Sequence, residues 1–337
     1  MKAIRLHGPD DLRCDTIPEP EIGPEDVLIR VKSVGICGSD LTYVKVGGVG
    51  LPVTAPIGLG HELSGVVDRT GSGVQDLSPG MRVVVNPMGG GNAIGNGMID
   101  GAFAPLLRVC NARLGDSIYR IPDHLDFETA ALAEPLSVAL HAVNRARVDD
   151  ATKAVVFGVG PIGLGIVACL RQRGCRQIVA VDMSDQRLAR AQTLGASVTV
   201  NPSRENVRDV LVDTHGHGQN FGQSCVNSDV FFEVTGAAQV ITNVIDFARF
   251  QARLVIVAVH AAPVEVNFQL ALAKEMDILM SMAYPDEFPA VIAMLAGGEI
   301  NVTAMISHRF GFEDFFEAFA TARDSVTSAK VLIDFSN

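Results

Sequence analysis

Side chains that bind zinc occur at three places in the first half of the chain. Cys37 lies in Gly-Ile-Cys-Gly-Ser-Asp, His61 and Glu62 lie in Gly-His-Glu, and Glu134 precedes Pro-Leu. A catalytic zinc site has three such protein ligands and one exchangeable position. Each residue alone has an ordinary explanation, because a lone Cys is usually a core thiol and a Glu at a helix start is favoured by the helix dipole. Together the motifs predict one site, with Cys37, His61 and a glutamate as ligands.

Two residues beside Cys37 could serve the chemistry of such a site. A zinc ion coordinates an alcohol oxygen, lowers its pKa and stabilises the alkoxide from which a hydride departs. The proton must then leave, and Ser39 could provide the first hydroxyl of a relay. Asp40 could accept a hydrogen bond from a ligating histidine and fix its ring.

A glycine-rich motif in the middle of the chain is typical of dinucleotide binding. Gly158-Val159-Gly160-Pro161-Ile162-Gly163 follows a short apolar run and precedes a helix-like stretch, and Asp182 ends the next apolar run. In a strand–turn–helix unit these glycines allow a tight turn, close approach of the pyrophosphate and close helix packing. The helix N-terminus offers free N–H groups to the phosphates. A tight turn without a ligand is the alternative.

Asp182 decides which dinucleotide is expected. Its carboxylate would accept hydrogen bonds from the adenosine ribose and repel a 2′-phosphate, and no Arg or Lys directly follows it, so NAD is favoured over NADP. Arg187 could flank the adenine. The cofactor-binding residues predicted from this region are Gly158, Gly160, Pro161, Ile162, Gly163, Asp182 and Arg187.

Two kinds of architecture must position these residues. The first third is rich in strand-like runs and turns, and residues 86–101 form an irregular loop of Gly and Asn. Farther on, strand-like and helix-like runs alternate, which favours βαβ units and a parallel sheet. Residues 213–228, with His215 and His217, are expected to form a surface loop rather than a metal site. The predicted strands include 27–34, 63–67, 82–85, 154–157, 178–181, 230–234, 254–257, 278–281 and 330–335, and the predicted helices are 162–173, 185–194, 288–296 and 312–322.

Composition excludes several classes of protein. The 337 residues suggest about two domains, and 48% hydrophobic against 19% charged residues indicates a globular chain. The net charge of −11 disfavours nucleic acids and anionic membranes as partners. There is no apolar run long enough to span a bilayer and no signal-peptide pattern, so we expect a cytoplasmic protein. The six scattered cysteines do not suggest a disulfide framework.

These motifs resemble those of the medium-chain zinc-dependent alcohol dehydrogenases, and of their polyol branch, from end to end of the chain. The resemblance includes residues 35–40, 60–62, 134–136 and 157–163, together with Asp-Gly-Ala-Phe at 100–103 and Ser-His-Arg-Phe at 307–310. It implies an α/β fold with a GroES-like β-rich catalytic domain, residues 1–143 and 284–337, and a Rossmann domain with a doubly wound parallel sheet, residues 144–283. It also implies a dimer or tetramer.

The resemblance further implies an activity and roles for residues. The activity is NAD-dependent oxidation of a secondary alcohol to a ketone, on a polyol, a sugar acid such as L-idonate, or a vicinal diol. Cys37, His61 and Glu62 would ligate zinc, and Glu134 would either ligate it or hold its water. Tyr43 and Tyr284 would contact the substrate, and Val257 and Val259 would cradle the nicotinamide.

Two departures from the family pattern affect these expectations. Residues 86–104 contain no cysteine, whereas many relatives carry a four-cysteine structural zinc lobe there, so one zinc ion per chain is expected. Ala283 replaces an arginine of the sorbitol dehydrogenases, which removes a fixed donor from the polyol pocket. A less polar diol or secondary alcohol therefore becomes more plausible.

Three alternative functions remain open. A zinc-free quinone or enoyl reductase has the same fold but does not need Cys37, His61 and Glu62 together. The chain could also have the specificity of a butanediol or threonine dehydrogenase. A non-catalytic protein that only binds the dinucleotide is the third alternative, and bound metal with turnover would exclude it.

Overall fold

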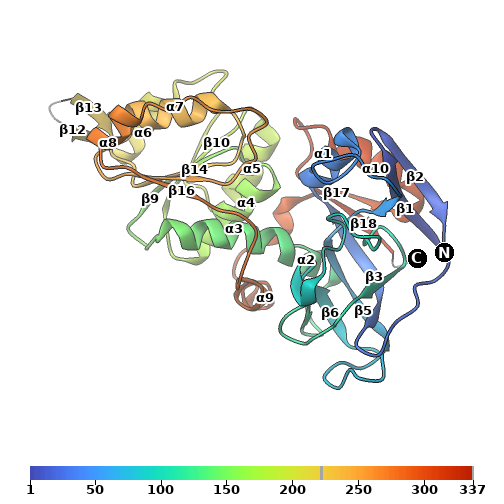
Figure 1. The fold of residues 1–337 in the computed structure, drawn as a ribbon. Helices are drawn as coiled ribbons and strands as arrows, with labels where there is room; N and C mark the ends of the chain where they lie inside the picture. Colours follow the sequence, from blue (N-terminus) through green and yellow to red (C-terminus); the bar gives the residue numbers. More distant parts are fainter. Residues whose placement is uncertain (221–222, 336–337) are drawn as a thin grey trace.

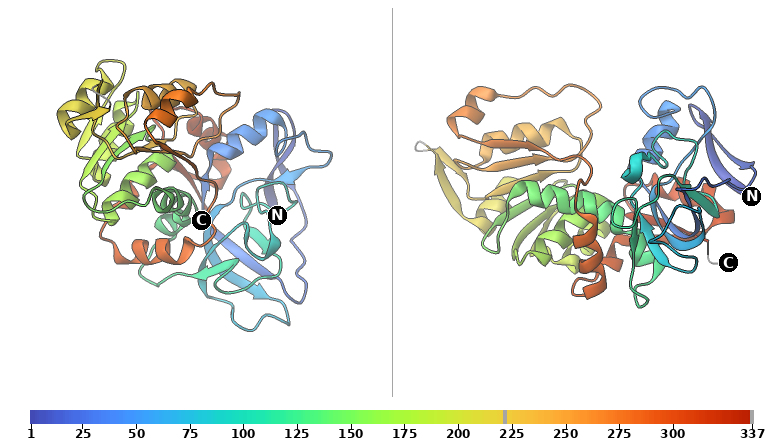
Figure 2. Two further views of the ribbon diagram at one scale, coloured as in Figure 1. Left: turned by 60° about the vertical axis from the view of Figure 1, so that its left-hand side comes forward. Right: turned by 60° about the horizontal axis from the view of Figure 1, so that its bottom comes forward.

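Two large β-sheets lie side by side in the computed structural model, which describes residues 1–220 and 223–335. Both ends of the chain lie in the β-rich half (Figure 1), and the middle of the chain forms the other half. Helices α2 (Phe127–Ala131) and α3 (Ala133–Ala146) lead from the first half to the second. Figure 2 shows the same two-part arrangement from two further sides.

The first sheet has seven strands in the order β17-β18-β3-β5-β6-β8, with β7 also paired to β3. Its pairs are antiparallel, apart from the parallel pair of β17 and β18. Val331 of β18 lies opposite Ile36 of β3, so the end of the chain completes a sheet that begins in the first third. Its strands are β3 (Val27–Ile36), β5 (Glu62–Thr70), β6 (Arg82–Val85), β7 (Leu106–Val109), β8 (Ile118–Arg120), β17 (Ile306–Gly311) and β18 (Lys330–Asp334).

The second sheet is parallel throughout, in the order β11-β10-β9-β14-β15-β16. The strand order reverses between β9 and β14, which is where ligands bind in doubly wound sheets. This confirms the α/β fold class with a Rossmann-type sheet. Its strands are β9 (Lys153–Phe157), β10 (Gln177–Val181), β11 (Val198–Val200), β14 (Val230–Glu233), β15 (Arg253–Ile256) and β16 (Asp277–Met280).

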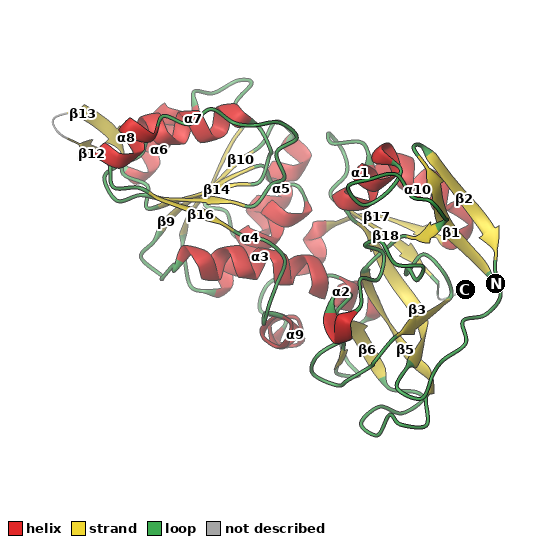
Figure 3. Cartoon of the chain, in the orientation of Figure 1, coloured by secondary structure: helices red, strands yellow, loops and turns green. Residues whose placement is uncertain are grey.

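Helices cover both faces of the parallel sheet (Figure 3). Val156 and Ala180 belong to the core on one face, while Val155 and Phe157 belong to the core on the other face, so the strands are apolar on both sides. The remaining helices are α1 (Gly38–Val46), α4 (Pro161–Gln172), α5 (Asp185–Leu194), α6 (Val207–His215), α7 (Ala238–Phe247), α8 (Phe268–Ala273), α9 (Phe288–Gly297) and α10 (Phe315–Ala322), with 3₁₀ turns η1 (Gly89–Gly91), η2 (Val302–Met305) and η3 (Phe312–Asp314).

Local signals explain where several elements begin and end. Helix α5 begins after Ser184, whose hydroxyl accepts a hydrogen bond from the Arg187 N–H, and ends at Gly195 with φ of 117°. Helix α4 begins after Gly160 with Pro161 in its first turn. The short strands β1 (Lys2–Gly8), β2 (Asp11–Thr16) and β4 (Ile57–Gly58) form a separate antiparallel sheet. Within the described residues, no helix is both long and apolar enough to cross a bilayer.

The expectation of a surface loop over 213–228 was wrong for the described part of that stretch. His215 ends α6 and is buried, and its ring Nδ1 lies 2.8 Å from the Ser228 hydroxyl. His217 begins β12 (His217–Asn220), which pairs with β13 (Gln223–Val226). Residues 221 and 222 lie outside the described residues.

Candidate metal centre and dinucleotide site

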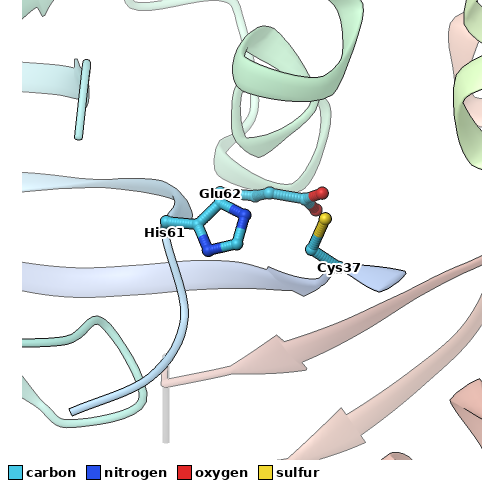
Figure 4. Close-up of side chains that lie close together, drawn as sticks. All are labelled: Cys37, His61 and Glu62. Atoms are coloured by element: carbon cyan, nitrogen blue, oxygen red, sulfur yellow. The ribbon is translucent and has the colours of Figure 1, made fainter. Parts of the chain in front are cut away.

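Strand pairing brings three metal-binding side chains together. Gly35 of β3 pairs with Glu62 of β5, so Cys37, just beyond the end of β3, lies beside His61 and Glu62. One ligand atom of each residue lies within 4.8 Å of the other two (Figure 4). His61 and Glu62 are buried and Cys37 is half-buried. This is the single group of this kind among the residues that the structure describes.

The donor set fits a zinc ion. Thiolate, imidazole and carboxylate side chains are the usual zinc ligands, and one ring nitrogen of His61 points toward Glu62 and Cys37 (Figure 4). A Cβ atom on Gly35 would lie 2.0 Å from the Glu62 Oε2 atom, so only glycine leaves room for this carboxylate. The backbone therefore accommodates the carboxylate beside the thiol.

Asp40 links the strand end to His61. Its carboxylate accepts hydrogen bonds from the Cys37 N–H at 2.9 Å and the Gly60 N–H at 3.2 Å, and lies 3.7 Å from His61 Nδ1. Burial raises the pKa of Asp40, while His61 opposes the rise. Burial alone would lower the pKa of His61, but Asp40 and Cys37 raise it well above its ordinary value. The Asp40 carboxylate therefore faces the buried Nδ1 atom of His61, which has no hydrogen-bond partner, and the predicted hydrogen bond between the two stays a prediction.

A buried lysine, which the sequence reasoning missed, holds Glu62. Lys330 Nζ donates to both carboxylate oxygens of Glu62, at 2.5 and 2.6 Å, and to the Ile36 carbonyl at 3.2 Å. Both charged side chains are only 1% exposed. Burial lowers the pKa of Lys330, but the attraction of Glu62 outweighs it and the pKa is raised. The only sign of this ion pair in the sequence was a lysine at the start of an apolar strand.

Glu134 lies on the other side of the centre, in the first turn of α3. Burial raises its pKa to about 7, against the attraction of His61, and neighbouring Glu62 adds to the rise. A hydrogen bond with Tyr284 acts in the opposite direction, and burial together with Glu134 raises the pKa of Tyr284. Glu134 and Tyr284 are therefore neighbours, and their predicted roles at the metal and the substrate stay predictions.

Ser39 and Tyr43 project from α1 toward the same centre. The Ser39 hydroxyl lies 3.5 Å from His61 Nε2. Burial raises the pKa of Tyr43, and the nearby Asp40 and Cys37 add to the rise. The Tyr43 phenol is therefore close enough to Cys37 to interact with it electrostatically. The Tyr43 hydroxyl donates a 3.0 Å hydrogen bond to Asn96 Oδ1 in the loop after η1.

A cavity of about 640 Å³ lies along the carboxyl ends of β9, β10 and β14. Gly158 has φ of 84°, and a Cβ atom on Gly163 would lie 1.9 Å from the Gly158 carbonyl oxygen, so both positions require glycine. No side chain caps the N-terminus of α4, which leaves its N–H groups free for phosphates. The lining residues include Gly158, Gly160, Asp182, Ser184, Arg187, Val207, Thr235, Val240, Ser325 and Val326.

The predicted cofactor residues have distinct places around this cavity. Asp182 accepts hydrogen bonds from the N–H groups of Val159 and Ser184, both at 2.8 Å, so its charge is held at the cavity wall. Arg187 donates from Nε to the Ser328 carbonyl at 2.8 Å, and its guanidinium lies 3.7 Å from where a Gly160 Cβ would stand. The Arg187 guanidinium therefore lies by the glycine turn, and its predicted contact with the adenine stays a prediction.

The other predicted cofactor residues lie outside the set that lines the cavity. Pro161 and Ile162 form the first turn of α4. Val257 and Val259 follow β15, and Val259 is 84% exposed. Sequence reasoning did not identify Ser325 and Val326, which come from the last segment of the chain to the same cavity.

Two family models match the two halves of the chain. The model described as alcohol dehydrogenase GroES-like domain matches residues 23–117, and the one described as zinc-binding dehydrogenase matches residues 161–297. The chain is 35% identical to human sorbitol dehydrogenase over 334 residues, which cover 95% of this chain and 92% of that protein. The chain belongs to the medium-chain zinc-binding dehydrogenases.

Solved structures of other members resemble this dehydrogenase over its whole length. The 2R,3R-butanediol dehydrogenase from Bacillus subtilis has a TM-score of 0.87 and 32% identity, covering 99% of both chains. The L-idonate 5-dehydrogenase from Escherichia coli has a TM-score of 0.84 and 27% identity, covering 99% of this chain and 98% of that one. The resemblance inferred from the motifs is thus confirmed, and the chain is an oxidoreductase of the polyol and diol branch.

Proposed function

We propose that this dehydrogenase oxidises one secondary hydroxyl of a vicinal diol, a polyol or a sugar acid such as L-idonate to the ketone, using NAD. The observation that carries the proposal is the convergence of Cys37, His61 and Glu62 beside Ser39 and Tyr43. The relatives act on a diol, a polyol and a sugar acid, and this supports the same substrate class here. Ala283, which lacks a polar side chain next to Tyr284, favours the less polar diols within this class.

Cys37, His61 and Glu62 are the proposed zinc ligands, because Glu134 is not part of their cluster. Bound there, zinc would act as a Lewis acid that lowers the pKa of the substrate hydroxyl. Ser39 would be the first hydroxyl of a relay, accepting the substrate proton while it passes its own proton on toward solvent. Asp40 would hold the His61 ring, and Glu134 with Tyr284 would exclude bulk water and orient the substrate. We propose one such ion per chain.

The NAD site would be the cavity that Gly158, Gly160, Asp182 and Arg187 border, and Gly163 would allow the tight packing of the turn behind it. The α4 N-terminus would bind the pyrophosphate through its free N–H groups. Asp182 would bind the ribose hydroxyls, while Val257 and Val259 would approach the nicotinamide. We also propose two domains, residues 1–143 with 284–337 and residues 144–283, because β18 at the end of the chain completes the first sheet. A cytoplasmic location is a separate proposal, supported by the six free cysteines.

The test is NADH formation with a panel of diols, polyols, sugar acids and monohydroxy secondary alcohols, with and without a zinc chelator. Turnover of one hydroxylated class that the chelator abolishes and zinc restores supports the proposal. Activity that survives complete removal of metal would support the zinc-free reductase instead. A chain that binds NADH and zinc but turns over none of the panel would contradict the proposed substrate class.

Asp182→Asn is expected to reduce the preference for NAD over NADP about tenfold to hundredfold, measured as the ratio of the two kcat/KM values, since each ~1.4 kcal/mol of lost repulsion is tenfold. The substitution removes the charge and one of the two accepting oxygens, so one of the N–H groups of Val159 and Ser184 also loses its partner. Asp185→Asn is the matched control, because Asp185 is exposed and already paired with Arg204, which lowers its pKa to about 2. Equal ratios in Asp182→Asn and the wild type would refute the role of Asp182.

We propose that two copies of the chain pair along strand β16. This strand is the edge of the parallel sheet, and exposed apolar side chains lie on it and near it: Val259, Phe268, Leu272, Met280 and Met282. An apolar open edge is suited to pairing with a second chain. The double substitution Met280→Lys/Met282→Lys is therefore expected to produce monomers in sedimentation velocity. Leu51→Lys, at an equally exposed apolar residue in the other half, should leave the mass unchanged, and an unaltered mass in both variants would argue against this interface.

A further inference from the structure

The short loop after η1 packs against the segment that leads to His61. Its backbone is bonded to the segment that precedes His61: the Gly58 N–H donates to the Ile99 carbonyl at 3.1 Å, and the Ala102 N–H donates to the Gly60 carbonyl at 2.9 Å. A Cβ atom on Gly95 would lie 2.3 Å from the Gly60 carbonyl oxygen. The loop is thus packed against the residue next to His61, and its side chains have defined positions there.

Asn96 stands at the tip of this loop in a fixed orientation. Its Nδ2 atom donates to the Ile94 carbonyl at 3.0 Å, which leaves Oδ1 to accept the hydrogen bond from the Tyr43 hydroxyl. The Asn96 N–H also donates to the Ala93 carbonyl at 3.0 Å. Because the amide is held from both sides, it presents an acceptor, not a donor, to Tyr43.

This contact decides what Tyr43 can offer to another molecule. A phenol has one proton, and in this structure that proton is given to Asn96. The Tyr43 oxygen can then only accept further hydrogen bonds. Ser39 is a hydrogen-bonding neighbour of Tyr43. Because the Tyr43 proton is given to Asn96, Ser39 is the donor in a hydrogen bond between the two hydroxyls. A group that binds the Tyr43 oxygen must therefore donate a hydrogen bond.

We propose that Asn96 is a specificity-determining residue, which orients the Tyr43 hydroxyl so that it accepts a hydrogen bond from a second hydroxyl of the substrate. Asn96 acts through Tyr43 and is a positioning residue. A vicinal diol or polyol has such a second hydroxyl beside the one that is oxidised, whereas a monohydroxy alcohol leaves the Tyr43 oxygen without a donor. The inference rests on the proposed function and adds to it the residue pair that would recognise the second hydroxyl of the substrate.

The test compares a vicinal diol with the monohydroxy secondary alcohol of the same chain length, using the zinc-loaded enzyme. Asn96→Ala is expected to lower the ratio of kcat/KM for the diol over the monohydroxy alcohol about fivefold to tenfold, mainly through KM, as the loss of one hydrogen bond predicts. The loop side chain is half-buried and its removal should leave the melting temperature nearly unchanged. In a Tyr43→Phe background the same substitution should have no further effect on the ratio.

A second readout does not depend on turnover. The chain has three tyrosines and no tryptophan, so the near-ultraviolet difference spectrum on adding the diol reports on tyrosine environments. The wild type should show a diol-induced change that is reduced in Asn96→Ala and reduced at least as far in Tyr43→Phe, where only the contribution of Tyr284 near the substrate remains. An unchanged diol preference in Asn96→Ala, with wild-type turnover intact, would overturn this inference alone. A wild-type enzyme that oxidises no diol at all would overturn the proposed function and this inference with it.

Discussion

Cys37→Ala should abolish both bound zinc and alcohol oxidation. The thiolate is one of three donors clustered within 4.8 Å, and a site with two remaining ligands no longer closes around the ion. A Lewis acid supplies several kcal/mol to such a reaction, so we expect kcat/KM to fall by roughly a thousandfold or more, at about 1.4 kcal/mol per factor of ten. Zinc content by atomic emission and NADH formation by absorbance measure the two losses.

The matched control for this substitution is Cys14→Ala. Cys14 is an exposed thiol on β2, in the small sheet of the β-rich half. The Cys14→Ala variant should keep full zinc content and full activity. The comparison with Cys37→Ala then distinguishes the effect of losing a zinc ligand from the effect of losing any thiol. NAD binding should be equal in both variants, because the dinucleotide cavity lies in the other half of the chain. Wild-type turnover by zinc-depleted Cys37→Ala would contradict the proposed centre.

Lys330→Met should strongly destabilise the zinc-free protein. The lysine is the partner of both Glu62 oxygens, and each side chain is only 1% exposed, so the substitution leaves a buried carboxylate without a counter-charge. Removing one partner of a buried ion pair costs about 3–5 kcal/mol. At about 2–4 °C per kcal/mol, the melting temperature of the chelator-treated protein should fall by roughly 10 °C.

A second variant tests whether the unpaired charge is the cause. In Glu62→Gln/Lys330→Met both charges are absent, and the melting temperature should recover most of the loss, since replacing a buried pair as a whole is often close to neutral. Zinc should raise the melting temperature of Lys330→Met by more than it raises that of the wild type, because the ion supplies the missing positive charge next to Glu62. Equal losses in the single and double variants would instead indicate a packing role for the Lys330 side chain.

The dinucleotide half was largely predictable because its signals are local. Gly158, Gly160 and Gly163 lie within six residues of one another, and the chain at this point forms a strand, a turn and a helix whose geometry depends on these residues. The bounds of α5 were predicted to the residue for the same reason, since Ser184 and Gly195 determine where it begins and ends. The alternation of strand-like and helix-like runs also indicated a parallel sheet.

The β-rich half was less predictable in its details. In the other half, the polar sequence of residues 213–228 suggested a surface loop, but His215 is buried at the end of α6 and contacts Ser228. In the β-rich half, Lys330 reaches Glu62 across 268 residues of sequence, and Asn96 reaches Tyr43 across 53. Neither contact has a local pattern, because each depends on which strand or loop lies beside which.

The sequence by itself determined the family to which this chain belongs and the side chains proposed for its chemistry, because the Cys, His and Glu motifs, the glycine turn and Asp182 are properties of short segments. The tertiary structure decided how those groups are used. Strand register places Gly35 opposite Glu62 and Lys330 beside it, and a shift by one residue would turn each of these side chains to the other face of the sheet. The pairing of Glu62 with Lys330, and the direction of the Tyr43 hydroxyl toward Asn96, therefore follow only from the packing of distant segments.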